Sequence, residues 1–357
     1  MKLYSALSLI GFGVGVAAFA AAGGCGSSGG DTGTTTATKG RQPAAKPDAP
    51  AAAIADARTF AVNSLQLGEG DRAGAANKDA WKDYGFDLDG TATTKDSKDV
   101  CTRLSGASSS NQEDGKDGID NAFGKVIIPF LQPFAATPSK TLTDSIVKGD
   151  FTIMLSIKGL TDDAAQTNTG LSGELLVGGK FGEGKSPTFT QADDWPYRAD
   201  PRIPISEGYV NKGTFVNGAG GATVTISLFI QGISLDLTIN KAIITFDHKP
   251  PNDIVNGTIA GVIGTEKLIS GLEKVAGRIS SQLCSGSTLD SIKATIRQAS
   301  DILQDGTNKA GVNCDAISVG IGFTGKRVGN PKTVAVEGAP SADPCAAAAD
   351  AGADSGN

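Results

Sequence analysis

The chain has 357 residues, of which 39% are hydrophobic and 20% are charged, with a formal net charge of −6 and an isoelectric point near 5.0. An acidic chain without a lysine or arginine cluster lacks the electrostatic footprint of a nucleic-acid-binding protein, so no nucleic-acid partner is expected. Only the N-terminus carries a long apolar run, and we therefore expect no transmembrane helix in the processed protein.

The N-terminus has the form of a bacterial export signal. Lys2 precedes an apolar run over residues 3–22, and two glycines lead into Cys25. This pattern predicts a lipoprotein signal peptide over residues 1–24 and attachment of lipid, such as palmitate, at Cys25. The alternative is cleavage at an ordinary small-residue site, which would leave Cys25 as a thiol or half-cystine. We expect a protein exported and anchored to the lipid bilayer of the bacterial envelope, in the outer membrane.

Composition divides the rest of the chain into three parts. Residues 25–55 are rich in Gly, Ser, Thr, Ala and Pro, which predicts a flexible tether. Residues 56–334 are long enough for a single globular β-rich domain. Residues 335–357 form a low-complexity tail in which only Cys345 suggests attachment to the domain.

Two acidic, glycine-containing segments stand near the start of this domain: GFDLDG at residues 85–90 and NQEDGKDGIDNAFG at residues 111–124. Calcium is bound by six to eight oxygen ligands, and carboxylates supply them well. The candidate ligands are Asp87, Asp89, Asp114, Asp117 and Asp120. The spacing differs from that of an EF-hand. The alternative is that Asp117 and Asp120 favour the N-terminus of a helix at residues 119–130 and that the glycines make turns.

These two segments also carry a resemblance. The chain resembles exported lipoproteins of myxobacterial type, which share GFDLDG-like and DGxxGIDNxFG-like segments around a cysteine. The resemblance covers residues 65–131 best. It implies export, anchoring and a common extracellular domain, and it carries no activity onto these residues.

Alternating apolar and polar residues predict many short strands. In residues 151–157, Phe151, Ile153, Leu155 and Ile157 share one face, and the same alternation recurs over residues 222–230 and 233–239. Further β-rich segments occur at residues 175–181, 209–216, 243–246 and 254–263. This pattern predicts a mainly β (α+β) fold, namely an antiparallel β-sandwich-like or open barrel domain.

The loop QADDWPYR lies between two of these strands. Trp195 and Tyr197, beside Asp193 and Asp194, form a candidate glycan-binding site, and paired carboxylates would suit glycan hydrolysis. The alternative is an ordinary turn with a half-buried tryptophan. The single histidine, His248, follows a strand, and no nucleophile motif accompanies it, so a catalytic triad is not predicted.

Two segments with helical spacing follow the strands. Apolar residues recur every three or four positions in residues 265–284 and again in residues 288–303. We expect a C-terminal helical hairpin packed on the sheet.

Five cysteines occur, and setting Cys25 aside leaves an even number suited to two disulfides. They are Cys101, Cys284, Cys314 and Cys345. Three pairings are possible. We favour Cys284 with Cys314, because they bracket what resembles a short helical hairpin, and Cys101 with Cys345.

The function expected from these features is that of an envelope-anchored lipoprotein with a non-enzymatic binding or structural role, stabilised by Ca²⁺. The alternative is a carbohydrate-binding or glycan-hydrolysing surface domain. The sequence does not identify a glycan or protein partner.

Overall fold

The structure is a computed structural model that describes residues 40–133, 137–218, 221–230, 233–279, 283–336 and Cys345. The predicted signal peptide, Cys25 and most of the predicted tail lie outside these residues. Within the described part, none of the helices combines the length and the apolar character needed to cross a membrane.

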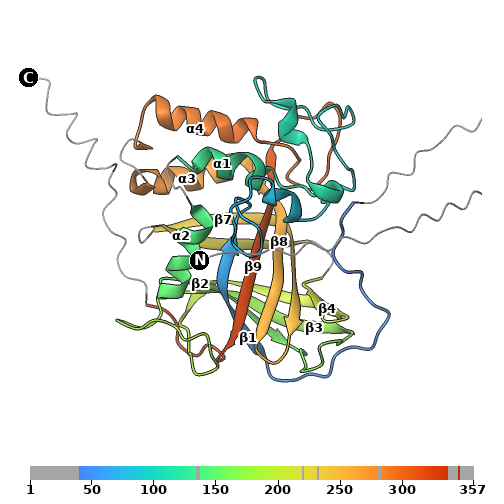
Figure 1. The fold of residues 1–357 in the computed structure, drawn as a ribbon, viewed down its shortest axis with the longest axis vertical. Coiled ribbons are helices and arrows are strands. Elements are labelled where there is room, and N and C mark those ends of the chain that lie inside the picture. The colour runs from blue at the N-terminus through green and yellow to red at the C-terminus, as the bar shows by residue number, and fades with distance from the viewer. Residues whose placement is uncertain are drawn as a thin grey trace, which may run out of the picture. The chain divides into compact units, whose positions relative to one another are not determined.

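Nine described strands form one antiparallel sheet (Figure 1). They are β1 (Arg58–Gln66), β2 (Thr152–Lys158), β3 (Asn168–Gly178), β4 (Tyr197–Asn211), β5 (Thr214–Val216), β6 (Ala222–Ile230), β7 (Ile233–Lys249), β8 (Asp253–Gly264) and β9 (Ala316–Val328). Their order is β5-β4-β3-β2-β1-β9-β8-β7-β6, and β5 also pairs with β7. Eight strands therefore close into a barrel, and β6 lies outside it as the partner of β7.

The predicted β-sandwich or open barrel is therefore wrong. Closure depends on the short strand β5, whose residues 214–216 pair with β7 on one side and with β4 on the other. Phe215 lies opposite Phe246 in this pairing, and their rings stack with centroids 4.7 Å apart. Only these three residues of β5 close the barrel. Their pattern of apolar and polar side chains would be the same in an edge strand, so the sequence does not reveal the closure.

The described helices are α1 (Ile128–Leu131), α2 (Pro138–Lys148), α3 (Thr265–Ile279) and α4 (Ser287–Gln298), with a π-helical turn at Phe123–Ile127. In Figure 1, α1, α3 and α4 lie together beyond one end of the barrel. Helix α2 packs beside β1, and the Ser139 hydroxyl accepts the N–H of Leu67 there.

The predicted C-terminal helical hairpin is also wrong. Helices α3 and α4 form close to the predicted positions, but they lie in the connection between β8 and β9, and α3 packs mainly on β7. The apolar stripe of α3 therefore covers the sheet, and the chain returns to the barrel after α4.

The barrel interior is filled by large apolar side chains from all around the wall, including Phe60, Leu155, Leu171, Phe215 and Phe323. An eight-stranded barrel is narrow enough for side chains to fill it. A smaller cluster lies on the outside of the wall, where Met154 and Leu176 pack against Trp195. This outer cluster explains why both faces of β2 are buried rather than one.

The predicted tether is described from Gly40 onward, where it runs as a strap over the domain. The Tyr209 hydroxyl donates to the carbonyl of Ala44 at 2.6 Å, and the Thr169 hydroxyl donates to the carbonyl of Ala49 at 3.0 Å. Asn168 of β3 and Asn211 of β4 make two further bonds of this kind, to the carbonyls of Pro50 and Ala45. The part of the predicted tether from residue 40 to residue 55 therefore belongs to the described domain.

Candidate metal centre

Buried and half-buried aspartates from three separate stretches of the chain lie close together beside β9. They are Asp87 and Asp89 from one loop, Asp114 and Asp120 from the next, and Asp301 from the segment after α4. One carboxylate oxygen from each of Asp87, Asp89 and Asp120 lies within 4.8 Å of the other two. This is a distance at which a single cation can contact all three carboxylates.

Backbone N–H groups hold the first loop in shape around Asp87. Its Oδ1 accepts the N–H of Gly90 at 2.6 Å and of Thr91 at 3.1 Å, and its Oδ2 accepts the N–H of Gly40 at 2.9 Å. Gly90 has a φ of +81°, a conformation that glycine adopts without strain. The predicted turn chemistry and the clustering of carboxylates therefore occur in the same loop.

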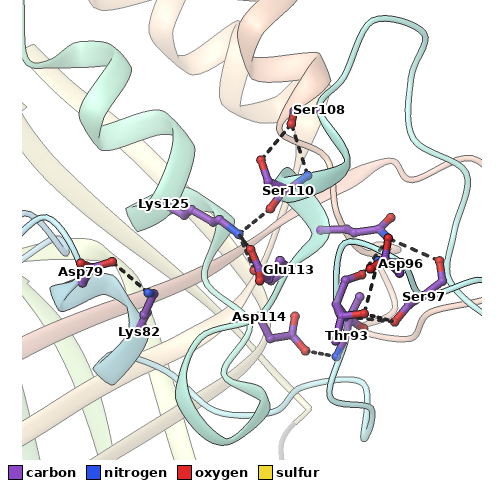
Figure 2. A network of polar contacts seen from close by, with 12 residues as sticks. Asp79, Lys82, Thr93, Asp96, Ser97, Ser108, Ser110, Glu113, Asp114 and Lys125 are labelled. Carbon is purple, nitrogen blue, oxygen red and sulfur yellow. Dashed lines mark hydrogen bonds and ion pairs between the residues drawn. The ribbon is translucent and has the colours of Figure 1, made fainter.

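The second loop brings two further carboxylates toward the first. Asp120 is only 3% exposed, and its Oδ2 accepts the N–H of Leu88 at 2.7 Å. Asp114 accepts the N–H of Thr93 at 2.5 Å, as Figure 2 shows. Asp120 does not cap the helix that follows, because Asn121 does so by accepting the N–H of Gly124.

The carboxylates destabilise one another's charged forms. Burial, followed by the charges of Asp89 and Asp301, raises the pKa of Asp114 to about 8. Burial raises the pKa of Asp301 to about 7, with Asp89 adding to the shift. The pKa of Asp120 is raised well above its ordinary value by burial and by Asp114. At neutral pH the cluster therefore requires either protons or a bound cation to offset its charge.

Lys125 is a nearby cation, but its hydrogen bonds are directed elsewhere. Its Nζ donates to the carbonyls of Ser110 and Glu113 and lies 4.7 Å from the centre of the Trp81 ring. In Figure 2 this ammonium group meets Ser110 and Glu113, whereas Asp114 is bonded to Thr93. Lys125 therefore makes the local electrostatic potential less negative without pairing with a carboxylate of the cluster.

Two residues differ from the predicted ligand set. Asp117 is exposed, with a φ of 55°, and its carbonyl accepts the N–H of Arg41. It belongs to a turn rather than to the cluster. Asp301 was not predicted, because it lay in what read as the end of a helix. Its carboxylate accepts both the N–H and the hydroxyl of Ser318.

The donors match a hard divalent cation. Every candidate ligand is a carboxylate oxygen, which suits Ca²⁺ or Mg²⁺ rather than a metal that prefers sulfur or imidazole. Four clustered carboxylates with irregular loop geometry favour Ca²⁺, because Mg²⁺ demands near-ideal octahedral ligands and retains several waters.

The prediction that the four remaining cysteines form two disulfides is confirmed, but the favoured pairing is wrong. Cys101 bonds to Cys314, and Cys284 bonds to Cys345. The reason is the course of the chain after α4. It returns beside the Cys101 loop, where the N–H of Cys314 donates to the carbonyl of Thr102.

The Cys101–Cys314 disulfide also adjoins the acidic cluster. Asn308 connects them by accepting the N–H of Cys101 and donating to Asp89 Oδ2.

The candidate glycan-binding residues have structural contacts. Trp195 is completely buried, and its Nε1 donates to the carbonyl of Gly179 at 2.7 Å. Asp193 accepts the N–H groups of Thr188 and Phe189. Asp194 accepts the N–H of Lys332, and the half-buried Tyr197 ring lies against Arg202. With its indole buried, this loop offers no tryptophan surface on which a sugar ring could stack.

Comparison of the chain with protein-family models, with curated proteins and with solved structures finds no match. The resemblance to exported lipoproteins therefore stays a prediction.

Proposed function

We propose that this protein is an exported lipoprotein, anchored to the bacterial envelope through lipid on Cys25, whose barrel domain has a non-enzymatic binding or structural role and is stabilised by Ca²⁺. The observation that supports the calcium part is the convergence of the carboxylates of Asp87, Asp89 and Asp120 from the two acidic loops. A cation at this point would join these two loops to one another.

The proposed role of Ca²⁺ is therefore to stabilise the loop end of the domain. Without a cation, repulsion between the carboxylates opposes the backbone hydrogen bonds that hold the two loops together. When a cation is bound, the same carboxylates become its ligands. Binding of an ion to the native state alone raises its stability according to the ion concentration and affinity.

Thermal unfolding with and without Ca²⁺ tests this proposal. The metal-free full chain should show a higher melting temperature when millimolar Ca²⁺ is added, because the ion binds only the folded cluster. Asp120→Asn should lose most of this increase. Asp117→Asn is the matched control, since it makes the same chemical change at an exposed position nearby, and it should keep the increase. Equal responses of the two variants would contradict the proposed site.

The anchor is tested separately by membrane fractionation. A Cys25→Ala variant should move from the membrane to the soluble fraction of the envelope, because one lipidated cysteine is the proposed means of attachment. Unchanged membrane retention of this variant would contradict lipidation at Cys25. This experiment is independent of the calcium experiment, because Cys25 is not one of the proposed calcium ligands and lies outside the described residues.

A further inference from the structure

The only histidine of the chain lies buried in the barrel without a hydrogen bond to its ring. His248 stands near the end of β7, its side chain is 2% exposed, and neither Nδ1 nor Nε2 has a partner among the described residues. A neutral imidazole carries one N–H donor, and burying a donor unpaired costs about 1–3 kcal/mol. An apolar residue would avoid this cost, so the histidine requires an explanation other than packing.

The immediate surroundings of the imidazole are apolar. The ring of Phe60 meets it edge-on with centroids 5.5 Å apart, and Ile254 lies opposite it on β8. Both neighbours are completely buried. These apolar neighbours can accommodate a neutral imidazole, but they offer no hydrogen-bonding group to stabilise a charged one.

Charged groups from three neighbouring elements face this pocket. They are Arg58 at the start of β1, Asp162 in the loop after β2, and Arg327 near the end of β9. The only carboxylate among them is already occupied, because both oxygens of Asp162 accept hydrogen bonds from Arg58, at 2.5 and 3.1 Å. A positive charge on the ring would thus be repelled by two guanidinium groups and would have to compete for one carboxylate.

The same residue adjoins the strand that closes the barrel. The backbone N–H of His248 donates to the carbonyl of Gly213 at 2.9 Å, and the preceding residue, Asp247, pairs with Thr214 of β5. Movement of the end of β7 would therefore act directly on the three-residue pairing between β5 and β7.

From these contacts we propose that His248 makes closure of the barrel sensitive to acid, with protonation of its imidazole separating the end of β7 from β5 and from the turn at Gly213. Water admitted by this opening would solvate both N–H groups of the imidazolium. The device does not depend on the proposed calcium site, because none of the clustered aspartates is among the charged groups that act on His248.

The electrostatic environment of the ring agrees with this geometry. Burial, and then the positive charges of Arg58 and Arg327, lower the pKa of His248 to about 4 from an ordinary value of 6.5. Between these two values an open state binds a proton and the closed state does not. The equilibrium constant for opening should therefore rise up to about tenfold for each pH unit of acidification.

Two measurements on the full chain in saturating Ca²⁺ test the proposal. Because the chain has one histidine, its imidazole C–H signals in an NMR spectrum are assigned without ambiguity when a purification tag without histidine is used. We expect these signals to titrate well below pH 6. Hydrogen exchange of residues 209–216, corrected for the intrinsic rate, should increase as the pH falls from 6.5 to 4.

His248→Phe is the control for other groups that titrate in this range. It fills a similar volume without a titratable nitrogen, so the additional acid-dependent exchange of β5 should disappear. Titration of the wild-type imidazole near pH 6.5 with unchanged exchange of residues 209–216 would overturn the proposal. So would equal acid-dependent exchange in wild type and His248→Phe. If this variant does not fold, the wild-type NMR titration decides alone.

Discussion

At the scale of single residues, the acidic centre is notable for carboxyl groups that accept backbone hydrogen bonds and whose pKa values are still raised by burial and by one another. Asp87, Asp89 and Asp120 could be identified as candidates because residue type and neighbouring glycines point to a calcium loop. Asp117 has the same type and spacing, but the turn directs it to solvent. Asp301 could not be identified, because its role depends on a contact with Ser318 that only the fold brings about.

Trp195 provides a stability prediction at the same scale. It is completely buried and packs against Phe181 and Phe189 with ring centroids 5.0 and 5.7 Å away. Trp195→Ala should lower the free energy of unfolding by about 3–5 kcal/mol, the usual cost of removing a large aromatic side chain from a core. Chemical denaturation measures this loss.

The matched control for Trp195 is Tyr197→Ala, which removes a half-buried ring from the same loop. Its loss of stability should be clearly smaller. Comparable, small effects of both substitutions would contradict the packing role assigned to Trp195.

At the scale of elements, the strands could be predicted more readily than their connections. The segments at residues 222–230 and 233–239 form β6 and part of β7, and the chain reverses direction between them, since Ile230 pairs with Ile233. Closure could not be predicted, because it depends on pairing between strands that are distant in the sheet order. The predicted disulfide pairing was wrong for a similar reason, because it depends on which distant segments the fold brings together.

The Cys101–Cys314 disulfide gives a prediction about the acidic loops. Replacing both cysteines with alanine should lower stability by about 2–5 kcal/mol, because a long loop is released. It should also weaken the response to Ca²⁺, because Asn308 connects Cys101 to Asp89. Melting curves with and without Ca²⁺ measure both effects.

The second disulfide serves as the control. Replacing Cys284 and Cys345 should also lower stability, but it should leave the Ca²⁺-dependent increase in melting temperature intact, because both cysteines lie outside the two acidic segments at residues 85–90 and 111–124. Loss of the Ca²⁺ response in this variant alone would contradict the proposed connection through Asn308.

At the scale of the whole molecule, stability should depend on pH through two sets of groups with opposite effects, the clustered aspartates and His248. Asp114 and Asp301 have folded-state pKa values of about 8 and about 7, above their ordinary value of 3.8. The metal-free native state therefore holds more protons than the unfolded state, and its stability should fall as the pH rises from 6.5 to 8. Below pH 6.5 the opposite dependence of His248 also contributes, because its pKa is lowered.

Denaturation in EDTA at several pH values measures this dependence. Stability should decrease by about 1–2 kcal/mol per pH unit between pH 6.5 and 8, and saturating Ca²⁺ should remove the decrease, because a bound cation favours the ionised carboxylates. Stability that stays constant across this window in EDTA would contradict the assigned protonation of the cluster.

Calorimetric titration of Ca²⁺ into the metal-free full chain near pH 7.5 is the most direct test of the calcium site. We expect a saturable heat with a stoichiometry of about one ion per chain, accompanied by release of protons from the carboxyl groups that become ligands. Repeating the titration in buffers of different ionisation enthalpy reveals that release. The absence of saturable heat at millimolar Ca²⁺ would contradict a calcium centre at Asp87, Asp89, Asp114 and Asp120.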